Sequence, residues 1–179
     1  MSSSGLLMYQ YYLVSDHSQG RKTMNLKSLN VNELFREYAK DHSTQGNLVT
    51  HWVGIPMIII GLLGLLSIIE FAQFEIFGYP FSINAALVLL SLGIVVYLIL
   101  DWRLGASFSI VLIMFYRLSH GIALPYHIAL FLLGWLFQGI GHVVFEKRSP
   151  SFMKNLIHLF IGPFFIFSKL LGFILRGFH

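Results

Sequence analysis

Long apolar runs are the feature that most constrains what this chain can fold into. A helix needs about 20 predominantly apolar residues to cross the ~30 Å hydrocarbon layer of a bilayer. Residues 51–71, 81–100 and 124–145 form three such runs, and a shorter and an interrupted run cover 104–118 and 152–175. The sequence predicts an all-α, polytopic membrane helical bundle with four spans, and a fifth at 152–175 that can instead lie in the interface.

The composition supports this fold class and excludes several functions. Apolar residues make up 56% of the chain and charged residues 11%, which fits neither a water-soluble surface nor a disordered chain. With no cysteine, the chain has no disulfide, thiolate zinc site, iron–sulfur cluster or covalently attached haem. The net charge of +4 comes without a long basic run, so nucleic acid is not an expected partner.

The chain divides into a loose N-terminal segment, residues 1–29, and a single membrane-embedded domain, residues 30–179. Asn30 and Glu33 resemble a capping box at the start of that domain. Apolar side chains then recur at helical spacing at Val31, Leu34, Phe35, Tyr38 and Ala39. This pattern predicts an amphipathic helix from about 31 to 40 that lies on the membrane surface.

The basic residues predict the orientation of the chain. The segment 71–80, expected to be a turn between the first two spans, contains no Lys or Arg, whereas the segments before the first span and after the second and fourth spans are basic. The positive-inside rule therefore places the N-terminus in the cytoplasm. We expect an integral membrane protein, in the inner membrane of a bacterium or the endoplasmic reticulum of a eukaryote.

This topology sorts the histidines by leaflet. Four of them converge on the cytoplasmic side, namely His42, His51, His142 and His158. Two lie on the opposite side, namely His120 and His127. One intramembrane histidine is equally well explained as an interhelical hydrogen-bonding group. Several on one side favour a functional site, because neutral imidazole binds iron, zinc, copper and nickel well.

Local spacing brings these groups together. Asn47 and His51 are four residues apart, and Gln138, His142 and Glu146 follow one another at the same interval, so each set lies on one helix face. The Ser43-Thr44-Gln45-Gly46 segment reads as a turn. We expect this turn to let His42 fold back over His51.

Two sequence blocks resemble a known family. The first is His42-x4-Asn47-x3-His51-x2-Gly54-x-Pro56, and the second, more specific one is GWLFQGIGHVVFEKRSP, residues 134–150. They are similar to the signature blocks of the membrane 2-hydroxy fatty acid dioxygenases, over roughly residues 30–175. The resemblance implies an Fe(II)-dependent enzyme that removes one carbon from a long-chain 2-hydroxy fatty acid (fatty acid α-oxidation), with His42, His51 and His142 as metal ligands. His158 lies outside the blocks and is added from the topology.

A mechanism can be hypothesised on this basis. Three imidazoles would hold one Fe(II), leaving positions open for dioxygen and for the carboxylate and 2-hydroxyl oxygens of the substrate. Glu146 is a candidate acceptor for an imidazole N–H or base for the 2-hydroxyl, and Gln138 and Asn47 are candidate orienting partners. A site at the membrane surface would leave the acyl chain among lipid, whereas extracting a sixteen-carbon chain into water would cost on the order of 10 kcal/mol.

Two other classes remain open. A haem b protein would use two of these histidines as axial ligands, and a non-catalytic membrane carrier or scaffold would need no redox centre. A carrier, however, should have polar groups through the depth of its bundle, and the middle of each predicted span is apolar apart from Gly and Ser. A di-iron hydroxylase or desaturase is disfavoured, because the chain lacks the closely spaced histidine pairs of those enzymes.

Overall fold

The structure is a computed structural model that describes residues 31–40, 42–147 and 157–176, most of them helical. Its elements, in chain order, are α2 (Val31–Lys40), α3 (Gln45–Ser67), β1 (Glu70–Ile76), β2 (Tyr79–Asn84), α4 (Ala85–Leu100), α5 (Trp102–Ser119), α6 (Leu124–Ile140), the π-helix η2 (Gly141–Glu146) and α7 (Ile157–Arg176). The helix expected at 31–40 is confirmed. Residues 1–29 of the expected loose segment lie outside the described residues.

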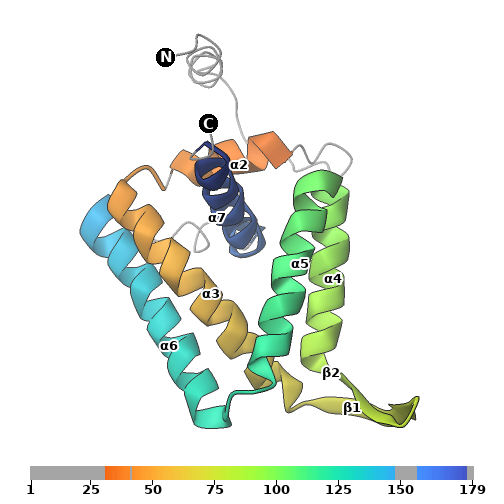
Figure 1. Ribbon diagram of the computed structural model, residues 1–179. Helices are drawn as coiled ribbons and strands as arrows, with labels where there is room; N and C mark the ends of the chain where they lie inside the picture. The colour runs from red at the N-terminus through yellow and green to blue at the C-terminus, as the bar shows by residue number, and fades with distance from the viewer. Residues whose placement is uncertain (1–30, 41, 148–156, 177–179) are drawn as a thin grey trace.

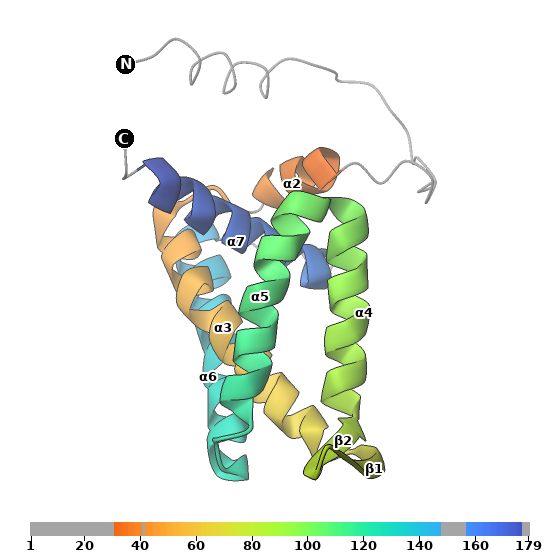
Figure 2. The same ribbon diagram turned by 45° about the vertical axis from the view of Figure 1, so that its right-hand side comes forward.

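Four helices, α3 to α6, run lengthwise through the molecule, and α2 and α7 gather at one end of them (Figures 1 and 2). The α7 helix runs obliquely between the others and continues through Pro163. The core at this end is aromatic: the fully buried Phe164 of α7 lies 4.8–5.8 Å, between ring centroids, from Phe35, Tyr97 and Phe108. Helix α7 is therefore anchored by α2, α4 and α5.

Helices α3 and α6 pack backbone to backbone through facing glycines. A Cβ atom on Gly54 would lie 2.9 Å from the carbonyl oxygen of Gly134, and a Cβ on Gly134 would lie 2.8 Å from that of Gly54. Small residues that permit such close approach are typical of helix pairs in membranes. Because α3 carries His51 and α6 continues into η2 with His142, this contact sets the distance between two of the predicted ligands.

A β-hairpin replaces the turn expected at 71–80. Strands β1 and β2 pair antiparallel at the end of the molecule opposite α2 (Figure 1), and the turn residues Phe77 and Gly78 both have positive φ. The predicted second span was wrong at its start, since residues 81–84 belong to β2 and Asn84 then caps α4. Apolar content alone does not distinguish a strand from a helix, which is why the hairpin was missed.

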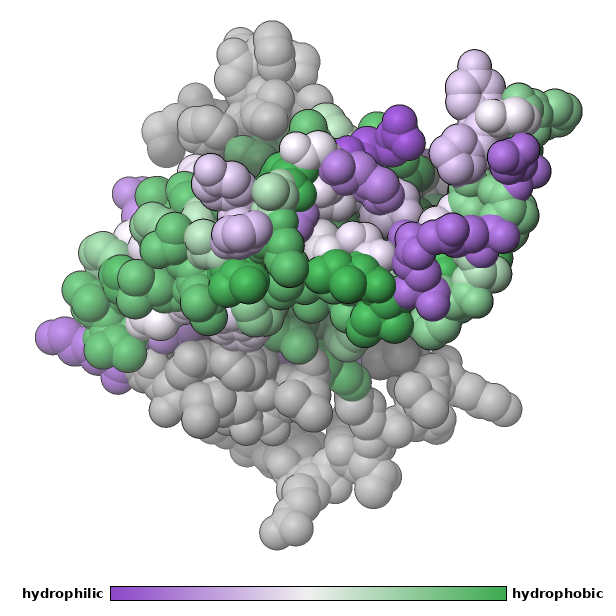
Figure 3. Space-filling view, turned by 90° about the horizontal axis from the view of Figure 1, so that it is seen from below, coloured by the Kyte–Doolittle hydropathy of each residue, from purple (hydrophilic) through white to green (hydrophobic). Residues whose placement is uncertain are grey.

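The outward faces of the long helices are apolar. Large apolar side chains are exposed on every lengthwise helix, for example Val53 on α3, Leu92 and Ile99 on α4, Ile110 on α5 and Leu132 on α6. Seen from the hairpin end, apolar side chains cover a broad continuous area (Figure 3). Among the described residues, two helices, Gln45–Ser67 and Leu124–Glu146, are long and apolar enough to cross a membrane. The helical, membrane-type character is consistent with the sequence, whereas four to five spans remain a prediction.

Candidate metal centre

Three imidazoles from separate parts of the chain meet at the α2 end of the molecule. His42 follows α2, His51 lies near the start of α3, and His142 belongs to η2; each side chain is at most 4% exposed. Their ring centroids are 4.7–5.1 Å apart and their planes cross at 78–83°. One ring nitrogen from each lies within 4.8 Å of the others. The expectation that His42 folds back over His51 is confirmed.

Backbone carbonyls fix the orientation of two of these rings. The Nδ1 of His42 lies 2.8 Å from the carbonyl oxygen of Tyr38, and the Nδ1 of His51 lies 2.9 Å from that of Asn47. Since a carbonyl can only accept, each Nδ1 carries the hydrogen and each Nε2 keeps its lone pair. This tautomer leaves each Nε2 able to bind a metal.

The third ring approaches because Gly141 leaves room for it. A Cβ atom at residue 141 would overlap the hydroxyl oxygen of Thr50 and lie 3.2 Å from Cε1 of His51. The six residues of η2 adopt a π-helix, a geometry often found at functional sites. The segment ends at Lys147, whose positive φ of 52° turns the chain away.

Glu146 ties the His142 segment to the turn before α3. Its Oε1 accepts hydrogen bonds from the backbone N–H groups of Ser43 and Thr44 at 2.7 and 2.8 Å and from the Thr44 hydroxyl at 3.0 Å. Its Oε2 accepts the Ser43 hydroxyl at 3.1 Å. The carboxylate thus fixes the turn between His42 and His51. Its predicted role toward an imidazole or a substrate hydroxyl stays a prediction.

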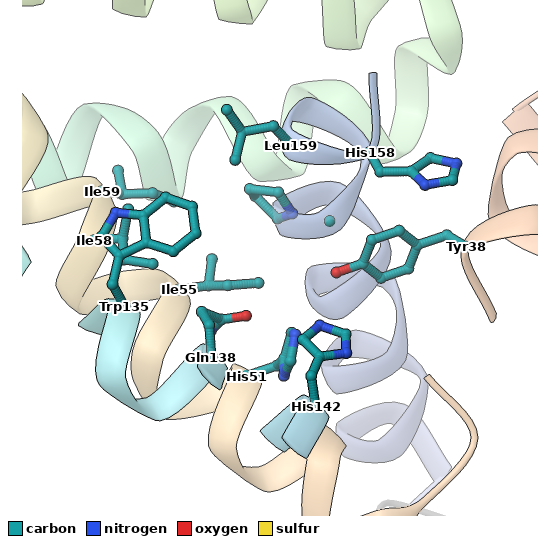
Figure 4. Close-up of a pocket in the computed structure, with 12 residues that line it drawn as sticks. Tyr38, His51, Ile55, Ile58, Ile59, Trp135, Gln138, His142, His158 and Leu159 are labelled. Atoms are coloured by element: carbon teal, nitrogen blue, oxygen red, sulfur yellow. The ribbon is translucent and has the colours of Figure 1, made fainter. Parts of the chain in front are cut away.

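The two predicted orienting amides are both buried. Asn47 is fully buried, and within the described part of the chain neither polar atom of its side chain has a hydrogen-bond partner; its backbone carbonyl is what holds His51. Gln138, 7% exposed, faces a cavity beside His51 and His142 (Figure 4). Buried polar groups without a partner require an explanation, and a bound ligand or water provides one.

The structure places His158 apart from the three clustered rings. His158, on α7, contacts the ring of Tyr38 edge-on with centroids 5.8 Å apart, and it is not among the ligand atoms that lie within 4.8 Å of one another. The sequence-based prediction included His158 because it considered only the side of the membrane on which a residue lies. That side does not determine where the residue lies in the plane of the membrane.

Tyr38 is the site residue that sequence reasoning missed. Its ring stacks on His42 at a centroid distance of 3.8 Å, and burial raises its pKa above the usual range, so the phenol keeps its proton. It was assigned only to the apolar face of the helix at 31–40. The available signal was its spacing of four residues from His42, the interval at which side chains meet along a helix, although α2 itself ends at Lys40.

A cavity adjoins the cluster, with an empty volume of about 460 Å³ including its mouth. Tyr38, His51, Gln138 and His142 line one part of it, and apolar side chains from α3, α6 and α7 line the rest (Figure 4). Pockets of this kind, mostly apolar with a few convergent polar groups, are typical of small-molecule sites.

The residues present fit a metal ion. Ligands of one ion with metal–nitrogen bonds of about 2.1 Å lie roughly 3–4 Å apart, and one nitrogen of each ring here lies within 4.8 Å of the others. Three neutral imidazoles suit iron, zinc, copper or nickel alike. The fold and the site therefore define a largely apolar helical protein with a buried three-histidine cluster that can hold a metal.

Comparison with known proteins identifies the family. The sequence profile of the "2-hydroxy-palmitic acid dioxygenase Mpo1-like" family matches residues 28–174. The chain is 30% identical over 143 residues to the 2-hydroxy-palmitic acid dioxygenase MPO1 of Saccharomyces cerevisiae, covering 75% of this chain and 78% of the yeast protein. No solved structure matches the chain. This protein belongs to the Mpo1-like family, as the resemblance of its two sequence blocks indicated.

Proposed function

We propose that this protein is an Fe(II)-dependent dioxygenase that cleaves long-chain 2-hydroxy fatty acids to the acid one carbon shorter. Family membership supports the reaction class, because the yeast relative is named as a dioxygenase of 2-hydroxy-palmitic acid. The observation that carries the proposal is the buried group of His42, His51 and His142. The overall reaction converts the 2-hydroxy acid and one dioxygen into the shorter acid, carbon dioxide and water, and it needs no other oxidant.

The three histidines are the proposed metal ligands. When bound, Fe(II) would supply the redox chemistry by which dioxygen cleaves the C1–C2 bond of the substrate. The chain's own contribution is to hold the imidazoles. The Nδ1–H bonds to the carbonyls of Tyr38 and Asn47 keep two Nε2 atoms available, and the Glu146 carboxylate holds the turn that separates His42 from His51.

The cavity is the proposed place of the substrate. Its polar part borders His51 and His142, where a carboxylate head would lie, and Ile55, Ile58 and Ile59 of α3 form an apolar wall for the acyl chain. Each buried CH₂ group contributes about 0.8 kcal/mol. This wall would also exclude water from the reacting end.

We place α3, α4, α5 and α6 across the bilayer, with the metal centre, α2 and α7 on the cytoplasmic side. Two observations support this. Exposed apolar side chains cover the lengthwise helices, and the basic residues Arg36, Lys40, Arg103 and Lys147 lie toward the α2 end, whereas the hairpin at the other end carries Glu70 and Glu75. Dioxygen, the 2-hydroxy fatty acid and membrane lipid are the proposed partners.

Metal analysis and product analysis on the purified protein test the proposal. The protein in lipid nanodiscs should contain about one iron per chain and convert 2-hydroxypalmitate to the fifteen-carbon acid only when dioxygen is present. An iron-loaded sample that is inert toward 2-hydroxy acids of all chain lengths would contradict the enzyme. An intense Soret band would instead identify haem ligation.

A further inference from the structure

The cavity beside the histidines presents two polar side-chain tips in addition to the imidazoles. The hydroxyl of Tyr38, from α2, and the carbonyl oxygen of Gln138, from α6, both point into it from opposite sides (Figure 4). The apolar wall continues from there past Trp135 and Leu159. The polar and apolar parts of the cavity thus follow one another, as the head and tail of an amphiphile do.

The position of the Tyr38 hydroxyl depends on a glycine. A Cβ atom at Gly162 would lie 2.7 Å from the phenolic oxygen and 3.2 Å from the carbon that bears it. Helix α7 therefore leaves room at this one point for the phenol to reach the cavity. A phenol O–H that reaches the cavity can donate a hydrogen bond to an anionic or neutral oxygen.

Gln138 offers the complementary group. Its side chain is more than nine-tenths buried, and within the described residues its Nε2 atom has no hydrogen-bond partner. The amide nitrogen is directed toward Gly54, 2.7 Å from where a Cβ atom would be, while the oxygen faces the cavity. An amide oxygen that faces the cavity can accept a hydrogen bond from a ligand there.

We infer that Tyr38 and Gln138 form a subsite that binds the head group of a 2-hydroxy acid. This subsite makes the protein bind a 2-hydroxy acid in preference to an unsubstituted fatty acid. In this subsite Gln138 accepts the hydrogen bond of the 2-hydroxyl, and Tyr38 donates to a carboxylate oxygen. An unsubstituted acid leaves the Gln138 oxygen without this hydrogen bond, and a site built to bind a hydroxyl discriminates against an analogue that lacks it. The inference rests on the proposed function, since it assigns the head group of the proposed substrate.

Displacement of radiolabelled 2-hydroxypalmitate from the nanodisc-embedded protein measures this selectivity without requiring turnover. Unlabelled 2-hydroxypalmitate should displace the label at a lower concentration than palmitate does. Gln138→Met should reduce the ratio of the two affinities about tenfold, as loss of one hydrogen bond to a ligand predicts. Tyr38→Phe should weaken the binding of both acids while the iron content stays at the wild-type level, because phenylalanine can still stack on His42.

Two further variants separate substrate contact from packing. Gly162→Ala should act like Tyr38→Phe, because its methyl group displaces the hydroxyl without removing it. Tyr97→Phe is the matched control: its buried hydroxyl donates to the carbonyl of Phe160 at 2.9 Å and lies outside the cavity lining, so both affinities should be unchanged.

The outcomes distinguish this inference from the proposed function. Wild-type protein without preference for the 2-hydroxy acid, or an unchanged ratio in Gln138→Met, overturns the role of Gln138. Loss of iron in Tyr38→Phe shows that the phenol acts through His42 and overturns its role as a substrate contact. Selective binding without dioxygen-dependent product contradicts the proposed reaction and leaves the subsite supported.

Discussion

The carboxylate of Glu146 accepts a hydrogen bond from the backbone N–H of Thr44 at 2.8 Å, although 102 residues separate them. Thr44 is the N-cap of α3, so the carboxylate lies where the unpaired N–H groups of a helix start favour a negative charge. His142 precedes Glu146 by four residues, and His42 and His51 flank Thr44. This one side chain therefore joins the segments that carry all three proposed ligands.

Removal of the Glu146 carboxylate should weaken iron binding without touching a ligand. Glu146→Ala loses four hydrogen bonds from Ser43 and Thr44, and because the site is partly open to solvent we expect a stability loss of about 1–2 kcal/mol and roughly tenfold weaker iron binding. Glu146→Gln keeps one acceptor oxygen and should lose less than half as much. Chelator competition for iron measures both variants.

The same pair of variants separates positioning from proton transfer. If Glu146→Gln binds iron nearly as well as wild type yet has no turnover, the carboxylate acts as a base toward the substrate, which is one of its two predicted roles. If iron content and turnover fall in parallel through both variants, the role of Glu146 is confined to the turn.

Each proposed ligand should be indispensable for iron. Replacing His42, His51 or His142 by alanine should remove bound iron and turnover, while the protein still inserts in the membrane. The matched control is His127→Ala, since His127 is also buried, at 4% exposure, but lies against Gly64, far along α3 from His51. That variant should lose about 1–3 kcal/mol of stability and keep its iron. Equal iron loss in all four variants would mean that packing explains the histidines.

Two neighbouring glycines on one helical segment should respond oppositely to the same methyl group. In Gly141→Ala the methyl would overlap Thr50 and press on the His51 ring, an overpacking that costs about 1–3 kcal/mol and displaces a ligand. In Gly139→Ala the methyl meets nothing within 4 Å, so stability should be unchanged or higher by up to ~1 kcal/mol. Thermal unfolding and iron content, measured on both, check this. Similar iron content in the two variants would contradict the tight fit at Gly141.

The structure could be predicted from the sequence where the hydrophobic periodicity and the distribution of charged residues determine it. The helix at 31–40 and the approach of His42 to His51 follow from local spacing, although the turn expected at 43–46 is shorter, because α3 already begins at Gln45. The meeting of His51 with His142 follows from topology plus two apolar helices. Prediction failed where the outcome depends on neighbours distant in sequence. Three features were missed for this reason: the hairpin at 70–84, the hydrogen bonds that Glu146 accepts from Ser43 and Thr44, and the stacking of Tyr38 on His42. Each depends on which segments and side chains face one another, and no single segment of the sequence encodes that.

The absence of cysteine makes the proposed orientation directly testable. Single cysteines can be introduced at Phe77, which is 96% exposed at the hairpin tip, and at Trp102, which is 68% exposed at the turn between α4 and α5. A membrane-impermeant maleimide should label Trp102→Cys from the cytoplasmic side of sealed vesicles and Phe77→Cys from the other side. The reason is that Arg103 marks the turn between α4 and α5 as cytoplasmic. Wild-type protein gives no background, and a permeant maleimide should label both variants. Labelling of both positions from one side would contradict the placement of α3 to α6 across the bilayer, and with it the position of the metal centre at the cytoplasmic surface.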